Sequence, residues 1–185
     1  MKTFQLTGDI ADFDYHSQFC DFVSSRAVKA FVNSLQPGEE ATIEINSCGG
    51  LVTEGIAMAN AIKNSKAHIT AHVTGLAASM ASVVACACEK LVMNEASFMM
   101  IHDPWAIVIG SAKEMRHEAS VLDTMKKAIL SFYRGKFSGT EDELAKLMEA
   151  ETWYTGAECK ANGFDCEVIA SDLKAAASLT GVKYE

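Results

Sequence analysis

Apolar and polar positions alternate along the chain with two periods, one typical of helices and one typical of strands. Over residues 24–35 the apolar side chains recur at helical spacing, and Gln36-Pro37-Gly38 is expected to end that helix. Residues 41–46 alternate in polarity as a strand does, and residues 52–62 return to helical spacing. Strands and helices that alternate at this length are typical of parallel strands joined by right-handed crossovers, so the pattern predicts an α/β fold.

The same succession of elements repeats further along the chain. Residues 69–73 predict a buried strand, Thr74-Gly75 a turn, and residues 77–88 a helix of small side chains. Two short strands, over residues 90–93 and 97–101, follow that helix. The repetition extends the α/β pattern over the first hundred residues.

A long helix is predicted over about residues 111–137, which exceeds the average helix length. One stripe of this helix is apolar and consists of Met115, Ala119, Leu122, Met125, Ile129 and Phe132. A further helix is expected from Thr140, because Thr140-Glu-Asp-Glu143 has the form of a capping box. A long helix with a single apolar stripe packs either on its own domain or on another subunit, and the period alone favours neither.

Composition and charge restrict the kinds of molecule that the protein is expected to bind. The chain has 185 residues and no linker or repeat that divides it, so residues 1–185 are predicted to form a single domain. Lys and Arg number 16 against 24 Asp and Glu, and the resulting net charge of −8 argues against binding to nucleic acid or acidic lipid. No apolar run reaches the ~18 residues of a membrane-spanning helix, and no signal peptide is recognised. We therefore expect a cytoplasmic protein that binds neither nucleic acid nor membranes.

The six cysteines are expected to be free thiols, as is usual in an intracellular chain of this size. The chain has no Cys-x-x-Cys pair, and Cys86 and Cys88 are predicted to face different sides of a helix. Neither a disulfide framework nor a structural metal site is therefore expected.

Ser79 is the candidate nucleophile. It lies where a buried strand is predicted to give way to a helix, so its hydroxyl would face the positive end of the helix dipole. The small neighbours Gly75, Ala77, Ala78 and Ala81 leave room for a substrate backbone. A helix-capping serine in a tight turn is the alternative interpretation of the same residue.

His102 is the candidate general base. It ends the apolar run of residues 98–101, and catalytic groups of α/β folds collect at the ends of strands. His68 and His72 would lie ~13 Å apart on one strand, at ~3.3 Å per residue, which is too far to chelate one metal ion. The other four histidines are expected at the surface or at a sheet edge: His16, His68, His72 and His117.

The pair Gly49-Gly50 is the third candidate element. Two glycines after a strand permit positive φ angles and leave amide N–H groups uncovered, as an oxyanion site requires. An ordinary tight turn is the alternative interpretation.

Taken together, these segments resemble the signature segments of the Clp protease proteolytic subunit family (ClpP). The segments are Asn46-Ser-Cys-Gly-Gly50-Leu-Val-Thr-Glu-Gly55, Gly75-Leu-Ala-Ala-Ser79-Met80 and Met100-Ile-His102-Asp-Pro104. The likeness runs from about residue 8 to residue 169. It implies a serine endopeptidase in which Ser79 is the nucleophile, His102 the general base, and the amides of Gly50 and Met80 the oxyanion donors. An extended peptide is expected to add as a strand beside residues Gly49, Leu51 and Val52.

The third member of the triad is where this sequence departs from the family pattern. Matching residues 150–158 to the family's segment places Glu151 where the family has aspartate. A glutamate can hold the imidazole if its extra methylene is accommodated. Asp103 and Asp165 remain alternatives. Cys48 replaces the family's proline before the two glycines, which is expected to relax that loop without removing its amide donors.

The resemblance also has implications for fold, assembly and substrate. It implies the stacked βαβ fold shared with crotonases, a projecting long helix, heptameric rings that stack in pairs, and neither metal nor organic cofactor. An ATP-driven AAA+ unfoldase is a possible partner. The Glu-Thr-Trp-x-Thr segment at Glu151 and the short N-terminus are similar to phage head-maturation peptidases, which would make capsid, scaffold or portal proteins the substrates.

Two other functions fit parts of the same pattern. The first is a ring or scaffold protein that kept the fold while its triad decayed. The second is a crotonase-type acyl-CoA enzyme, which would share the oxyanion architecture and use carboxylates in place of a serine nucleophile.

Overall fold

The computed structural model describes residues 1–12 and 21–170, so the expectations for His16 and Cys20 lie outside the described residues. Within this part of the chain the main sheet has seven strands. They are β1 (Lys2–Thr7), β4 (Glu40–Ser47), β5 (His68–Ala78), β6 (Lys90–Asn94), β7 (Phe98–Ile101), β8 (Thr152–Thr155) and β9 (Glu167–Ile169). Strands β1-β4-β5-β6-β9 are parallel neighbours in that order, β7 pairs in parallel with β5, and β8 adds antiparallel to β7. The predicted α/β fold is confirmed.

The helices over residues 25–33, 52–63, 112–133 and 141–149 lie where the sequence predicted helices, whereas the helix over residues 156–161 was not predicted. The helices are α1 (Ser25–Asn33), α2 (Val52–Lys63), α3 (Met80–Ala87), α4 (Ala112–Tyr133), α5 (Glu141–Glu149) and α6 (Gly156–Ala161). Two short strands, β2 (Asp9–Ile10) and β3 (Phe22–Val23), form a small parallel pair beside the main sheet. The capping box predicted at Thr140 and Glu143 is present at the start of α5. Apolar residues of the strands and helices form one core, in which α3 is buried along its whole length.

The turn predicted at Thr74-Gly75 and the helix predicted from residue 77 are wrong, because β5 continues to Ala78 and α3 begins at Met80. The ladder continues because a second partner takes over from the first. Strand β6 pairs with β5 as far as Val73, and β7 pairs with it from Leu76. His68 and His72 were expected at the surface or at a sheet edge; His68 is exposed and His72 is partly exposed, and neither is at an edge, because β5 lies between β4 and β6. Both histidines lie on the outer face of the sheet and contact Glu89 and Asn94.

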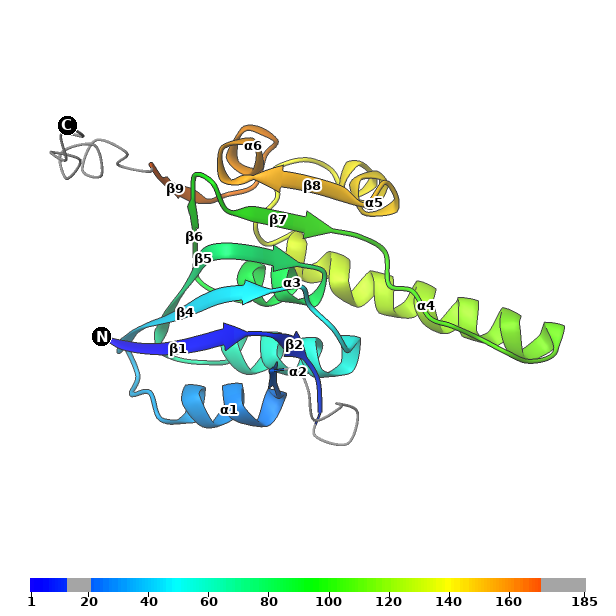
Figure 1. The fold of residues 1–185 in the computed structure, drawn as a ribbon, viewed down its shortest axis with the longest axis horizontal. Coiled ribbons are helices and arrows are strands. Elements are labelled where there is room, and N and C mark those ends of the chain that lie inside the picture. The colour runs from blue at the N-terminus through cyan, green and yellow to red at the C-terminus, as the bar shows by residue number, and fades with distance from the viewer. Residues whose placement is uncertain (13–20, 171–185) are drawn as a thin grey trace, which may run out of the picture.

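Helix α4 is shorter than predicted and ends at Tyr133. Gly135 follows, a residue with low helix propensity, and Phe137 instead forms an antiparallel bridge with Phe164, with the ring centroids 5.1 Å apart. Figure 1 shows α4 projecting well beyond the rest of the molecule.

The apolar stripe of α4 divides into two halves. Ile129 and Phe132 are buried in the core, whereas Met115 near the free end is 49% exposed. The second half of the helix therefore packs on its own domain, and the first half extends into solvent.

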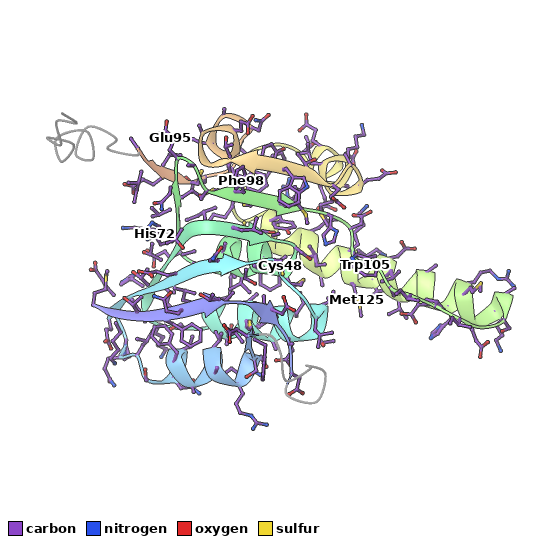
Figure 2. The ribbon with its side chains drawn as sticks, viewed as in Figure 1. Cys48, His72, Glu95, Phe98, Trp105 and Met125 are labelled. Carbon is purple, nitrogen blue, oxygen red and sulfur yellow. The ribbon has the colours of Figure 1, made fainter. Side chains whose placement is uncertain are left out.

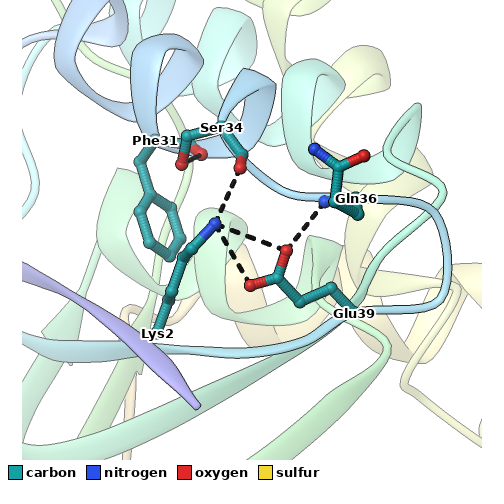
Figure 3. A network of polar contacts seen from close by, with 5 residues as sticks. All are labelled: Lys2, Phe31, Ser34, Gln36 and Glu39. Carbon is teal, nitrogen blue, oxygen red and sulfur yellow. Dashed lines mark hydrogen bonds and ion pairs between the residues drawn. The ribbon is translucent and has the colours of Figure 1, made fainter.

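Polar contacts fix the amino end of the sheet (Figure 3). Lys2 Nζ donates to the Ser34 carbonyl oxygen at 2.8 Å and pairs with the Glu39 carboxylate at 3.1 Å. Glu39 also accepts a hydrogen bond from the Gln36 amide at 2.8 Å. This backbone contact, followed by the contact with Lys2, lowers the pKa of Glu39 below its ordinary value. These contacts tie β1 to the chain that links α1 to β4.

The five described cysteines are free thiols, and burial raises the pKa of Cys86 and of Cys88 to about 12. Within residues 1–12 and 21–170, no three His, Cys, Asp or Glu side chains gather as metal ligands. In the same residues, no helix has the length and apolar character needed to cross a membrane.

Candidate active site

Three strands deliver the candidate residues to one end of the sheet. Strand β4 ends just before Gly49 and Gly50, β5 ends at the residue before Ser79, and β7 ends at the residue before His102. Because these strands are parallel neighbours, their carboxyl ends meet at the same edge. Segments far apart in the sequence are thus brought together.

Ser79 and His102 are in direct contact. The distance from His102 Nε2 to Ser79 Oγ is 2.7 Å, although the two residues are 23 positions apart. Ser79 is the N-cap residue of α3, yet its side chain makes no capping hydrogen bond. The hydroxyl is directed to the imidazole instead, as an activated serine requires.

The backbone of Ser79 has an unusual conformation, with φ 53° and ψ −126°. This region is unfavourable for residues with a side chain and costs about 1–3 kcal/mol, so the surrounding structure must hold it. The Ser79 amide donates to the Met100 carbonyl oxygen at 3.0 Å, which anchors the residue to β7. The sharp turn places the hydroxyl in the cleft, between the end of β5 and the first turn of α3.

The glycine pair packs directly against the serine. A Cβ on Gly49 would lie 2.7 Å from Ser79 Cβ and 2.8 Å from Met80 N, and a Cβ on Gly50 would overlap the Ile10 carbonyl oxygen. Both glycines also have positive φ angles, 93° and 146°. In the described part of the chain, neither the Gly50 amide nor the Met80 amide donates a hydrogen bond. Two free N–H donors therefore lie beside the serine, as an oxyanion site requires.

The segment expected to bind peptide is paired on one side already. The Ile10 amide donates to the Gly49 carbonyl oxygen at 2.7 Å, and the Leu51 amide donates to the Ile10 carbonyl oxygen at 2.8 Å. Val52 is the first residue of α2, as its helical spacing predicted, and it lines the cleft. The extended part is limited to residues 49–51.

Cys48 tethers the glycine loop. Its thiol donates to Asp9 Oδ1 at 3.0 Å, which links the loop to β2. The Asp9 carboxylate, followed by partial burial, raises the pKa of this thiol. We expected this loop to be relaxed because Cys48 replaces a proline. The hydrogen bond from Cys48 to Asp9 instead restrains it.

A cleft of about 1060 Å³ opens in front of the serine and histidine. Figure 2 shows Cys48, Trp105 and Met125 at this end of the molecule, where α4 leaves the body, and all three line the cleft. Much of the remaining lining is apolar and includes Ile10, Leu51, Val52 and Leu122. A cleft of this size and character accommodates an extended stretch of polypeptide.

The structure distinguishes the three candidate acids. Glu151 lines the cleft and has a positive φ of 50° just beyond α5. Asp103 is committed to Lys126 of α4, with Oδ2 2.7 Å from Nζ. Asp165 is not among the residues that line the cleft. In the described residues no carboxylate forms a hydrogen bond with His102 Nδ1, although Glu151 lines the same cleft as the histidine.

Two buried hydroxyls near the serine were missed by the sequence analysis. Ser82 and Tyr133 are 0% and 1% exposed, and both contact the Ser79 carbonyl oxygen. The available signals were weak: a serine inside an apolar helix, and a tyrosine at the end of an apolar stripe. Neither pattern indicates by itself that the two side chains meet.

The sequence matches the Clp protease family over residues 15–172. It is 29% identical to the ATP-dependent Clp protease proteolytic subunit of Bacteroides fragilis over 157 residues, which cover 83% of this chain and 76% of the relative. It is 32% identical to proteolytic subunit 1 of Chlamydia abortus over 134 residues, 70% of each chain. A third relative, proteolytic subunit 3 of Rhodococcus jostii, is 25% identical over 92% of this chain and 82% of its own length.

The match covers β4, β5 and β7 together with all three segments that carry the serine, histidine and glycine pair of the cleft, whereas β2, which also lines the cleft, precedes the match. The α/β fold with its mostly parallel sheet agrees with the same family. The chain therefore belongs to the Clp protease family and is a serine peptidase of that family.

Proposed function

We propose that this chain hydrolyses peptide bonds with Ser79 as the nucleophile and His102 as the general base. The observation that carries the proposal is the 2.7 Å contact between Ser79 Oγ and His102 Nε2 beside two free amide donors. As Ser79 Oγ attacks the scissile carbonyl carbon, His102 Nε2 takes the hydroxyl proton. The amides of Gly50 and Met80 stabilise the negative charge on the carbonyl oxygen.

The intermediate then collapses, and the carbon–nitrogen bond breaks as His102 gives the proton to the leaving amine. A water molecule attacks the resulting ester in the same way, with His102 again as the base, and regenerates the Ser79 hydroxyl. We propose Glu151 as the carboxylate that orients His102 through Nδ1. Its place in the lining of the cleft supports this role, and a change of side-chain rotamer on substrate binding or assembly would complete the contact.

The substrate we propose is an extended polypeptide. It would lie along Gly50 and Leu51, make backbone hydrogen bonds there, and place apolar side chains against Val52, Leu122 and Met125. Backbone bonds are tolerant of side chains, so broad specificity follows.

We further propose that the chain works as a homo-oligomeric ring, with seven subunits in each ring, in the cytoplasm. Its relatives are named as proteolytic subunits of an ATP-dependent protease, which supports assembly and an ATP-driven unfoldase as partner. The projecting half of α4 and the exposed side chains of Trp105, Ile107 and Ile109 support contact with other subunits. Light scattering of the purified protein tests this, and a monomer at micromolar concentration would contradict it.

The narrower assignment to phage head maturation stays a prediction. It depends on the Glu-Thr-Trp-x-Thr segment at Glu151, and the relatives named above do not support it. The two rival functions are separable by experiment. A decayed scaffold protein would hydrolyse no peptide, and an acyl-CoA enzyme would turn over a CoA thioester even after Ser79→Ala.

The experiment that tests the proposal is hydrolysis of fluorogenic peptides by the wild type and single variants. Ser79→Ala is expected to lower kcat on the order of 10⁶-fold, and His102→Ala by a similar factor, because the two residues act as a unit. His68→Ala is the matched control, since this histidine lies on the outer face of β5 and contacts Glu89. Equal activity of the wild type and Ser79→Ala would contradict the proposal.

A further inference from the structure

We propose that Ser82 and Tyr133 are positioning residues that fix the peptide group between Ser79 and Met80, and so aim the Met80 amide at the oxyanion. The inference rests on the function proposed above. It assigns a role to two buried hydroxyls, one from α3 and one from the last turn of α4.

The contacts around these hydroxyls are short. Ser82 Oγ lies 2.6 Å from the Ser79 carbonyl oxygen, 2.9 Å from the Met100 carbonyl oxygen and 2.7 Å from Tyr133 Oη. Tyr133 Oη lies farther from the Ser79 carbonyl oxygen, at 3.4 Å. Both carbonyls belong to the surroundings of the nucleophile: one is the carbonyl of Ser79 itself, and the other, that of Met100, accepts the Ser79 amide at 3.0 Å. The two hydroxyls thus contact the Ser79 carbonyl directly and the Ser79 amide through its acceptor, the Met100 carbonyl.

Counting protons assigns the direction of these bonds. The two hydroxyls have one proton each, and the carbonyl oxygens only accept. Ser82 donates its one proton to the Ser79 carbonyl oxygen, the nearer of the two carbonyls, and the Ser82 oxygen accepts the proton of Tyr133. The chain of donation runs from Tyr133 to Ser82 and from Ser82 to the Ser79 carbonyl. Tyr133 therefore acts mainly through Ser82.

The geometry of the peptide group connects this cluster to the oxyanion site. The Ser79 carbonyl and the Met80 amide belong to one planar trans peptide group, so they point in opposite directions. Holding the oxygen on the buried side fixes the N–H on the cleft side. The Ser79 carbonyl oxygen also accepts the Ser82 amide at 3.0 Å and the Val83 amide at 3.3 Å, so the two hydroxyls add to the first turn of α3 in holding a residue whose φ and ψ are unfavourable.

The surroundings keep Tyr133 a hydrogen-bond donor. Its side chain is buried within the core, and burial raises the pKa of its hydroxyl, so the group stays protonated throughout the working range of a peptidase. In a site that excludes water, the hydroxyls have only each other and the two carbonyls as partners.

The test compares Tyr133→Phe, Ser82→Ala and the double variant with the wild type in steady-state peptide hydrolysis. Each single variant is expected to lower kcat by ~10-fold while KM changes by less than about twofold, because the donor acts on the transition state and not on the bound peptide. The double variant is expected to lose no more than Ser82→Ala, because Tyr133 acts through Ser82. Tyr154→Phe, which removes a hydroxyl from another buried tyrosine, is the matched control and keeps its activity.

A second readout separates positioning from general destabilisation. A peptide aldehyde forms a tetrahedral adduct on the serine, with its oxygen in the oxyanion site, so it should bind Tyr133→Phe ~10-fold more weakly than the wild type. Tyr133→Phe removes one oxygen atom and keeps the ring, so the fold survives, and circular dichroism verifies it. An active wild type with unchanged kcat and aldehyde affinity in both single variants would overturn the inference. A wild type that neither hydrolyses peptides nor binds the aldehyde would overturn the proposed function instead.

Discussion

The two ends of the parallel sheet differ in what their polar groups do. At the amino end, Lys2, Glu39 and the Gln36 amide satisfy one another, and the His68 ring contacts the Glu89 carboxylate. At the carboxyl end Cys48 and Asp103 are paired with Asp9 and Lys126, but two backbone donors beside the serine are left available. The Gly50 and Met80 amides donate no hydrogen bond within the described residues, and the Ser79 hydroxyl is held by His102.

The backbone shows the same contrast. Gly38, before β4, has a φ of 77° with no atom near its missing Cβ, so this glycine serves only a turn. Gly49 and Gly50, after β4, have positive φ angles and are also packed too tightly for any side chain. The two ends therefore differ in one respect that matters for chemistry. Only at the carboxyl end does tightly packed backbone hold unpaired amide donors beside a serine, within the described residues.

Among variants that compare the two ends of the sheet, Glu151→Gln is expected to lower kcat the most. The amide no longer favours the charged imidazole, so kcat is expected to fall ~10²- to 10⁴-fold while the fold is kept. Peptide hydrolysis measures kcat, and circular dichroism reports the fold.

Three matched variants accompany that measurement. Glu89→Gln at the amino end, Asp103→Asn and Asp165→Asn each remove one carboxylate charge and are expected to keep most of the activity. Unchanged turnover in Glu151→Gln together with a large loss in Asp103→Asn or Asp165→Asn would transfer the role to that aspartate.

The next largest effect is expected from Gly50→Ala. The new Cβ would overlap the Ile10 carbonyl oxygen, so the loop must move and carry its amide away from the oxyanion. Loss of one such donor costs ~10²- to 10³-fold in kcat. Gly38→Ala imposes a positive φ on alanine at the other end of the sheet, without a clash, and should lower stability by ~1 kcal/mol with no change in kcat. Equal kinetic losses in the two variants would erase the contrast between the ends.

The smallest effect is expected from Glu39→Gln, in the melting temperature measured as the pH is lowered. Because its pKa is lowered in the folded state, Glu39 contributes stability above the ordinary carboxyl range, and this contribution is lost as the pH falls through the folded-state pKa. The melting temperature of Glu39→Gln should therefore be slightly below that of the wild type at neutral pH and approach it as the pH falls below the folded-state pKa of Glu39. A constant difference between the two at all pH values would assign the effect to packing. Peptide hydrolysis at neutral pH should be the same in both.

Much of the fold could be predicted because its signals are local. The capping box at Thr140 and the apolar periods of α1 and α2 are contained within single elements. The extension of β5 to Ala78 could not be predicted, because it depends on β7, which takes over as the ladder partner beyond β6. A pattern within one segment does not reveal which strand lies next to it.

The candidate site divides in the same way. Resemblance to a family indicated Ser79 and His102, and the structure brings the two side chains together. The third residue of the triad stays a prediction, because Glu151 lines the same cleft as His102 and, among the described residues, no hydrogen bond between them is seen. The contact between Ser82 and Tyr133 joins residues 51 positions apart, so only the folded chain reveals it.

Labelling with a fluorophosphonate probe, followed by peptide mapping, tests whether Ser79 is an activated nucleophile. The probe reacts with a serine only when a base and an oxyanion site activate it. We expect a single adduct on Ser79; it should be absent in Ser79→Ala and form far more slowly in His102→Ala. A wild type that stays unlabelled, or an adduct that persists in Ser79→Ala, would contradict this role of Ser79.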